Sequence, residues 1–197
     1  APEPVFHDKE TINIVRDFIK LRYRLMPYNY TLAYQNSTSG LPLMRPMLFA
    51  DEENKNWLSV DEQYFWGESF LVKPVTEPGI ESIEVNLPEG KWFDFWSGKT
   101  YEGNQVIDYP VHLETLPVLV KAGSIIPTVP ARSSTKAYVS ETLQLDYYFD
   151  PSVSVSEYTM YEDDGLSASS LDNNNYELLE FKATLNGDLS KTLLFNL

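Results

Sequence analysis

Acidic side chains offer the first candidates for chemistry, because two carboxylates held close together can serve as a general acid and a general base. Asp61 and Glu62 are adjacent in the sequence, and adjacent residues point in different directions on a helix or a strand. An acidic helix N-terminus is therefore favoured over an acid/base pair at that position. Glu162, Asp163 and Asp164 could bind calcium, but they lack the alternating oxygen ligands and the distal Glu of an EF-hand loop. A solvated hairpin turn is favoured for them, since an Asp-Gly pair follows.

The two histidines do not suggest a metal site. His7 and His112 lie in unlike surroundings and have no ligand spacing between them. Each is therefore interpreted as a surface or packing residue. The sequence also has no glycine-rich phosphate loop, no Gly-x-Ser-x-Gly motif and no cysteine. No cofactor and no metal ion are predicted, and no segment contains a self-sufficient active site.

An aromatic cluster at residues 92–96 is the candidate for sugar stacking, although packing between domains is favoured. Strand alternation places Phe93 and Phe95 on one face and Trp92, Asp94 and Trp96 on the other. Burying an unpaired Asp94 would be costly. Phe93 and Phe95 are therefore expected to face the core.

Charge and hydropathy exclude two classes of partner. The formal net charge is −14, whereas binding to nucleic acid or to anionic membrane surfaces requires clustered Lys and Arg. No apolar run approaches the roughly 18 residues of a membrane-spanning helix. We predict neither a nucleic-acid partner nor a membrane.

The N-terminal part of the sequence has helical periodicity. Two stripes of apolar residues predict one helix over residues 9–25 and another over residues 28–37, with a break at Pro27. Asp8 is a suitable N-cap for the first helix, and Gly40 is a suitable left-handed cap after the second. These helices are expected to be the weak part of the chain, because their apolar faces need neighbouring elements to cover them.

The remaining sequence has the alternation and turn residues of an all-β region. We expect a strand at 43–49, a short helical turn at 60–66 and a linker at 128–135. The strands expected before the linker are 70–75, 82–87, 92–95, 105–109 and 117–121. Those expected after it are 143–149, 156–161, 176–184 and 191–197.

Seven segments, in order along the chain, resemble glycoside hydrolase family 31, which includes α-glucosidases and α-xylosidases. Together they cover roughly residues 16–165, and their specificity comes from the series rather than from any one of them. The segments are residues 22–34 (RYRLMPYNYTLAY), 40–46 (GLPLMRP), 61–67 (DEQYFWG), 71–79 (LVKPVTEPG), 90–98 (GKWFDFWSG), 121–127 (KAGSIIP) and 161–165 (YEDDG).

The resemblance implies an α+β fragment: the last helical and strand part of a (β/α)8 barrel followed by two antiparallel β-sandwich-type C-terminal domains. Residues 1–50 would be the end of the incomplete catalytic barrel, with its final strand near residues 43–47. Residues 51–127 would be the proximal C-terminal β-domain. Residues 128–197 would be part of a truncated distal one.

The resemblance also implies the function. The parent protein would be a retaining glycoside hydrolase that cleaves α-glycosidic bonds of oligosaccharides, with α-glucosidase favoured and α-xylosidase next. Its catalytic Asp pair would lie upstream of residue 1, so no catalytic residue is assigned in this chain and its substrate-binding residues stay unknown. The isolated chain is expected to be inactive and to favour self-association through exposed helix faces. The alternative is a non-catalytic carbohydrate-binding or structural β-sandwich module.

Overall fold

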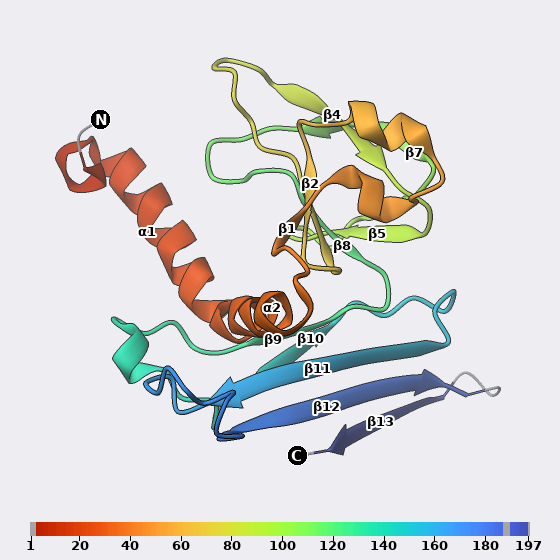
Figure 1. The fold of residues 1–197 in the computed structure, drawn as a ribbon. Coiled ribbons are helices and arrows are strands. Elements are labelled where there is room, and N and C mark those ends of the chain that lie inside the picture. The colour runs from red at the N-terminus through yellow and green to blue at the C-terminus, as the bar shows by residue number, and fades with distance from the viewer. Residues whose placement is uncertain (1–2, 187–189, 197) are drawn as a thin grey trace.

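The chain consists of two helices followed by several antiparallel sheets (Figure 1). The computed structural model describes residues 3–186 and 190–196. Short 3-10 helices lie at Pro4–Phe6, Met47–Ala50, Lys55–Ser59 and Thr135–Ala137. Within the described residues, no helix has the length and apolar character needed to cross a membrane.

The two helices have the bounds that their capping residues predict. The first, α1 (Lys9–Arg24), begins after Asp8, whose side chain accepts a hydrogen bond from the Thr11 amide at 2.9 Å. The second, α2 (Met26–Ser39), carries a proline in its first turn, where a missing N–H costs nothing. It ends at Gly40, which has a φ of 77° and so forms the predicted left-handed cap.

A six-stranded antiparallel sheet forms the centre of the molecule. Its strands, in spatial order, are β1 (Met44–Arg45), β2 (Tyr64–Trp66), β3 (Phe70–Val72), β8 (Val118–Lys121), β5 (Lys91–Asp94) and β6 (Thr100–Glu102). The antiparallel pair β4 (Ser82–Leu87) and β7 (Gln105–Pro110) packs on one face, with Val85, Leu87 and Trp92 almost fully buried between the layers. Helix α2 packs on the other face through Tyr28 and Leu32. Both faces of the central sheet are therefore covered.

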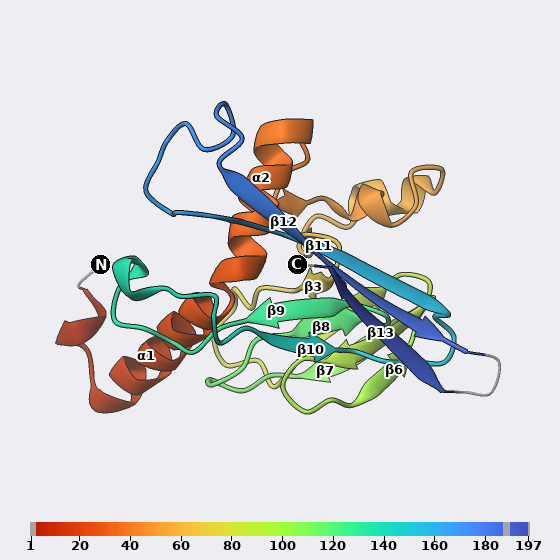
Figure 2. The ribbon, with the colours of Figure 1, turned by 90° about the horizontal axis from the view of Figure 1, so that it is seen from below.

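A second β-layer lies on the far side of α2. Strands β9 (Ile125–Thr128) and β10 (Gln144–Tyr147) pair, and β11 (Val155–Asp163), β12 (Tyr176–Leu185) and β13 (Lys191–Asn196) form a three-stranded sheet. Figure 2 shows this sheet crossing β9 and β10 obliquely. A small core that includes Ile125, Met160 and Phe181 lies between them.

Two local predictions in the first half of the chain need correction. The strand predicted over 43–49 is only Met44–Arg45, and Met47–Ala50 form a 3-10 helix, because Pro46 cannot donate to a ladder. The helical turn predicted over 60–66 is wrong, since Tyr64–Trp66 are strand β2 between β1 and β3. Strand β1 pairs antiparallel with β2 of the central sheet. The assignment of residues 1–50 to the end of a catalytic barrel stays a prediction.

The prediction for the aromatic cluster is confirmed in part for Phe95, which packs against the core beneath α2, and is wrong for Trp92 and Asp94. Trp92 and Asp94 are buried on the β4–β7 side, with exposed fractions of 1% and 5%. Asp94 tolerates burial because it accepts hydrogen bonds from the Tyr109 hydroxyl and, at 2.7 Å, from the Ser97 amide. Phe93 is half-buried, and its ring lies 5.7 Å from that of Tyr148.

Two connections in the second half also differ from the prediction. The linker cannot start at Thr128, since Thr128 ends β9 and Val129 is buried, with its amide bonded to the Arg24 carbonyl at 3.0 Å. Strand β9 pairs with β10, so its residues straddle the predicted boundary between 127 and 128. The tight hairpin predicted at Asp164-Gly165 is instead a longer loop, because β11 ends at Asp163 and β12 begins at Tyr176.

Candidate functional site

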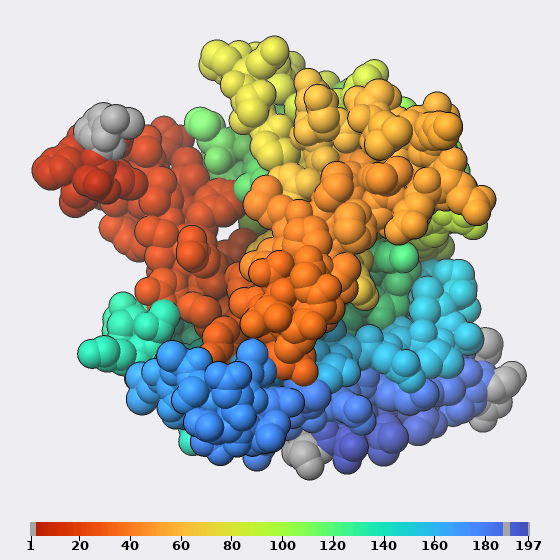
Figure 3. Space-filling view, in the orientation of Figure 1, coloured from red at the N-terminus to blue at the C-terminus, as the bar shows by residue number. Residues whose placement is uncertain are grey.

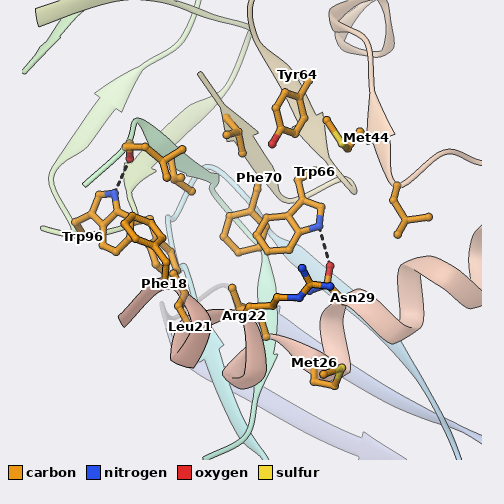
Figure 4. A pocket seen from close by; sticks show the side chains of 16 residues that line it. Phe18, Leu21, Arg22, Met26, Asn29, Met44, Tyr64, Trp66, Phe70 and Trp96 are labelled. Atoms are coloured by element: carbon orange, nitrogen blue, oxygen red, sulfur yellow. Dashed lines mark hydrogen bonds between the residues drawn. The ribbon is translucent and has the colours of Figure 1, made fainter. Parts of the chain in front are cut away.

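An apolar groove lies between the helices and one face of the central sheet (Figure 4). We call it the helix–sheet groove; its volume is about 560 Å³. The α1 and α2 side contributes Phe18, Leu21, Arg22, Leu25, Met26 and Asn29. The sheet side contributes Leu43, Met44, Tyr64, Trp66, Phe70, Val72, Phe95, Trp96, Leu116 and Val118.

Hydrogen bonds hold the aromatic walls of this groove in place. The Trp66 indole N–H donates to Asn29 Oδ1 at 3.0 Å, and the Trp96 indole N–H donates to the Leu116 carbonyl at 2.7 Å. With these donors satisfied, both ring systems add apolar surface to the groove. Phe70 is fully buried between the sheet and α2. Trp66, Trp96 and Phe70 therefore give the sheet side of the groove aromatic walls that are held in place.

The α1 side is much less well packed. None of the 16 residues of α1 is buried, and Ile19 remains 50% exposed. Phe18 does contact the sheet side of the groove: its ring packs edge-on against that of Trp96, with the ring centroids 5.9 Å apart. A second hollow, of about 950 Å³ and with several charged side chains in its lining, lies along α1 as well. In Figures 1 and 3, the N-terminal part of α1 projects away from the β-strands.

The lining of the helix–sheet groove does not provide acid/base chemistry. Among the described residues that line it, none is Asp or Glu, and Arg22 is the charged one. Hydrolysis of a glycosidic bond by the retaining route needs two carboxyl groups about 5 Å apart. What this groove can do is bury apolar surface of another element.

The acidic candidates have structural partners. Glu62 accepts a hydrogen bond from the Lys73 ammonium at 2.6 Å, and this contact lowers the pKa of the Glu62 carboxyl below its ordinary value. The predicted helix N-terminus at Asp61 and Glu62 is wrong, because the next element is strand β2. The carboxylate of Glu62 is an ion-pair partner for a lysine whose side chain is only 6% exposed.

The second acidic run is bound into the end of β11 and the loop after it. Asp163 accepts hydrogen bonds from the Tyr30 and Tyr161 hydroxyls at 2.8 and 2.7 Å, and Asp164 accepts from the Ser167 amide at 2.8 Å. Burial raises the pKa of Glu162, which accepts a hydrogen bond from the Tyr138 hydroxyl. In the described part of the chain, no group of three His, Cys, Asp or Glu residues is arranged to hold a metal ion.

The remaining candidates are divided between surface and groove. His7 and His112 are both exposed. Of the aromatic cluster, Phe95 and Trp96 line the helix–sheet groove. Tyr64, Trp66 and Phe70 also line the groove, and none of them was predicted to be a site residue. The two-residue spacing of Tyr64 and Trp66 is typical of one face of a strand, but a helical turn was predicted over residues 60–66.

Comparison with known proteins identifies the family. Residues 40–126 match the sequence profile described as "Glycosyl hydrolase family 31 C-terminal domain". The α-xylosidase of Saccharolobus solfataricus is 33% identical over 166 residues, which are 84% of this chain and 22% of that protein. Human neutral alpha-glucosidase AB is 31% identical over 83% of this chain and 18% of its own length.

A solved structure gives the same result for the fold. A mutant of the Flavobacterium johnsoniae family 31 dextranase, in complex with isomaltotriose, superimposes with a TM-score of 0.85 at 34% identity. The match covers 93% of this chain and 23% of the dextranase. The chain thus spans about a fifth of the length of the relatives that it matches. The chain belongs to glycoside hydrolase family 31, of which it contains the C-terminal domain region.

Proposed function

We propose that this chain is the C-terminal supporting part of a retaining α-glycoside hydrolase. The helix–sheet groove and the uncovered face of α1 receive the rest of the catalytic barrel, which carries the catalytic Asp pair. The chain itself supplies a rigid β-platform and holds the last helices of the barrel in position. On this account the barrel includes residues 1–50, and the two β-domains follow at residues 51–127 and 128–197.

The observation that supports this proposal most directly is that α1 is amphipathic but none of its residues is buried against the rest of the described chain. An apolar stripe on a helix normally faces a core, because each buried Å² of apolar surface contributes roughly 25 cal/mol. In α1 this stripe includes Phe18, Ile19 and Leu21, yet none of them is buried. The facing groove is apolar and lacks acidic residues among those described. A further protein segment fits this surface better than a polar sugar does. In the isolated chain, the same uncovered face favours self-association.

An α-linked oligosaccharide is the proposed substrate of the whole protein. Its relatives by sequence include an α-xylosidase and an α-glucosidase, and the structure of a related dextranase mutant is a complex with isomaltotriose. We favour α-glucosidase over α-xylosidase activity. The residues that select the sugar are proposed to lie in the catalytic part rather than in this chain.

The alternative is a carbohydrate-binding module that acts without catalysis. The exposed Tyr30 and the half-buried Tyr34 beside Tyr161 favour it, since exposed rings can stack on sugars. However, Tyr34 already stacks on Tyr161 at 4.5 Å, and the Tyr30 hydroxyl is bonded to Asp163. These rings have protein partners, which favours a structural role.

A chimera tests the supporting role. Residues 1–197 would replace the matching segment of the Saccharolobus solfataricus α-xylosidase, and hydrolysis of aryl α-xyloside and aryl α-glucoside would be measured. The chimera is expected to be active and the isolated chain inactive. Phe18→Asp in the groove should lower the activity of the folded chimera, whereas Leu166→Asp in an exposed loop should not. Turnover by the pure isolated chain would contradict the proposal, and specific glycan binding by that chain would support the alternative.

A further inference from the structure

The turn that follows β5 joins the helix–sheet groove to the opposite face of the central sheet. Phe95 and Trp96 line the groove on the side of α2. The preceding residue, Asp94, is only 5% exposed and bonds to Tyr109 of β7, in the layer that covers the other face. Adjacent residues of a strand point to opposite faces. The same short segment therefore reaches into both layers.

Asp94 closes this turn with its main chain and its side chain. Its amide donates to the Lys99 carbonyl at 2.7 Å, and its carbonyl accepts from the Gly98 amide at 2.9 Å. Oδ1 of its carboxylate accepts from the Ser97 amide at 2.7 Å and from the Ser97 hydroxyl, while Oδ2 accepts from the Tyr109 hydroxyl. The carboxylate thus connects the turn to β7.

A second turn in the chain shows that local closure does not require burial. Asp164 accepts hydrogen bonds from the amide and the hydroxyl of Ser167, three residues later, at 2.8 and 2.6 Å. Asp94 and Ser97 have the same spacing and the same pair of donors. Asp164 is exposed, however, whereas Asp94 is buried. What distinguishes the buried turn is the additional bond to Tyr109.

Burial of the Asp94 carboxylate has a cost that this bond helps to offset. Removing a charge from water disfavours folding unless the charge is paired or hydrogen-bonded. Among the residues that the structure describes, no Lys, Arg or His forms an ion pair with Asp94. Burial, together with the Asp94 carboxylate, raises the pKa of Tyr109, so its hydroxyl stays protonated and donates. The bond from Tyr109 therefore holds the turn against β7.

The two rings of the turn depend on this placement. The Phe95 amide donates to the Val118 carbonyl at 3.0 Å, and the Trp96 indole N–H donates to the Leu116 carbonyl at 2.7 Å. The Trp96 ring in turn contacts the Phe18 ring of α1, with centroids 5.9 Å apart. Both hydrogen bonds require the turn to lie close to the beginning of β8. A shift of the turn would therefore move the wall of the groove that contacts α1.

We propose that Asp94 is a positioning residue for the helix–sheet groove. By joining the turn to Tyr109 of β7, its carboxylate orients Phe95 and Trp96 for contact with α1 and with the rest of the catalytic barrel. The contact with the barrel rests on the function proposed above. The orientation of the two rings does not, because the bonds that determine it all lie within the described residues.

Fluorine NMR of the isolated chain tests the orientation of Trp96. The chain has four tryptophans, so fluorotryptophan labelling gives one signal for each, and Trp96→Phe identifies the signal of Trp96. The shift of this signal between light and heavy water measures the exposure of the ring. Asp94→Asn should increase that shift, because one amide oxygen cannot accept from both Ser97 and Tyr109. Tyr109→Phe should increase it as well.

The double variant and two controls separate positioning from a general loss of stability. Asp94→Asn combined with Tyr109→Phe should expose Trp96 no more than the stronger single variant, whereas the effects of independent sites would add. The controls are Asp108→Asn, at an exposed position of β7, and Tyr101→Phe, at the half-buried tyrosine of β6. Neither control should change the Trp96 signal.

All variants are measured at a concentration at which sedimentation gives monomers, and far-ultraviolet circular dichroism checks that they are folded. An unchanged Trp96 signal in Asp94→Asn would overturn the proposal. Additive effects of Asp94→Asn and Tyr109→Phe would also overturn it, because the two residues would then act separately.

The chimera with the α-xylosidase tests the contact with the barrel separately. Asp94→Asn should lower the hydrolysis of aryl α-glycosides by the folded chimera, and Asp108→Asn should not. A loss with Phe18→Asp but not with Asp94→Asn would overturn the positioning role and leave the proposed function intact. Full activity of both variants would contradict the proposed function, while the fluorine signal of Trp96 would still decide whether Asp94 orients the ring.

Discussion

The two consecutive helices α1 and α2 have similar lengths and opposite surroundings. Helix α2 lies between the central sheet and β11, and it buries Tyr28, Thr31 and Leu32. Helix α1 has the clearer apolar stripe, yet buries no residue. The difference shows that a stripe of apolar residues predicts that a helix needs a packing partner. It does not predict that the partner lies in the same segment of the protein. In this chain the cover for α2 is present, and the cover for α1 is not among the described residues.

This comparison corrects one expectation about stability. The sequence predicts that both helices are the weak part of the chain, because both have broad apolar faces. Helix α1 has no buried residue whereas α2 has four, so the weakness is now predicted for α1 alone. The rings of Trp66 and Phe70 surround Tyr28 at centroid distances of 5.6 and 5.1 Å, and the Tyr28 hydroxyl donates to the Trp66 carbonyl at 2.7 Å. Helix α2 is therefore an integral part of the core.

Truncating one aromatic residue on each helix should give the largest contrast. Tyr28→Ala is expected to lower the free energy of unfolding by about 3–5 kcal/mol, since it removes a fully buried ring. Phe18→Ala on α1 should cost about 1 kcal/mol or less, because its ring is already half-exposed. Urea unfolding of both variants measures the difference.

Tyr28→Phe is the matched control for this contrast. It keeps the ring and removes the hydroxyl that donates to the Trp66 carbonyl. A loss of about 1–2 kcal/mol is expected from the unpaired carbonyl. Equal losses from Tyr28→Ala and Phe18→Ala would show that α1 has a complete core of its own.

A glycine beneath α2 should give the next largest effect. Gly67 has a φ of 65°, and a Cβ there would meet the Tyr28 hydroxyl and lie 2.8 Å from a Leu32 methyl. Gly67→Ala should cost about 2–4 kcal/mol, because backbone strain adds to overpacking. Gly40→Ala, at a φ of 77° with open space around its Cβ, should cost only about 1–2 kcal/mol. Equal losses would contradict the close packing of α2 on the sheet.

Ion pairs give the smallest contrast, through the dependence of stability on pH. The Lys73 contact lowers the pKa of Glu62 below its ordinary 4.5, so the ionised carboxyl stabilises the folded state above that pH. This contribution is lost as the pH falls through the lower folded-state pKa. Glu62→Gln should flatten the fall in stability below about pH 4.5, as measured by urea unfolding.

The comparison variant for this pH test is on α1. Asp17 pairs with Lys20 at 3.2 Å, but both side chains are largely exposed. An exposed pair contributes about 0–1 kcal/mol. Asp17→Asn should therefore leave stability almost unchanged at pH 7. If Asp17→Asn lowered the free energy of unfolding more than Glu62→Gln does, α1 would be packed tightly against the central sheet.

The sequence predicted those parts of the fold in which local signals and tertiary surroundings agree. Asp8 and Gly40 mark helix ends whatever surrounds them, and the alternation at Ile83, Val85 and Leu87 predicts a half-buried strand. Trp92 and Asp94 could not be placed, because one of the partners that satisfy Asp94, Tyr109, is fifteen residues away.

Prediction of the candidate site was limited in the same way. The α1 side of the groove follows from helical periodicity, which any amphipathic helix shows. The sheet side depends on the pairing of β2 with β1 and β3. Strand β2 is only three residues long, and its alternation is too short to distinguish a strand from a helical turn. Tyr64 and Trp66 were therefore not assigned to a common surface with Phe70.

Hydrogen exchange of the isolated chain tests most directly whether α1 is an uncovered docking element. The measurement would be made on a dilute monomer, so that a second copy cannot cover the helix. Protection follows buried contacts. Amides of α1 between Ile12 and Tyr23 should exchange much faster than those of α2 near Leu32 or of β4 near Val85, which are 3% and 0% exposed. Equal protection of α1 and α2 in the monomer would contradict the account, because α1 would then need no partner.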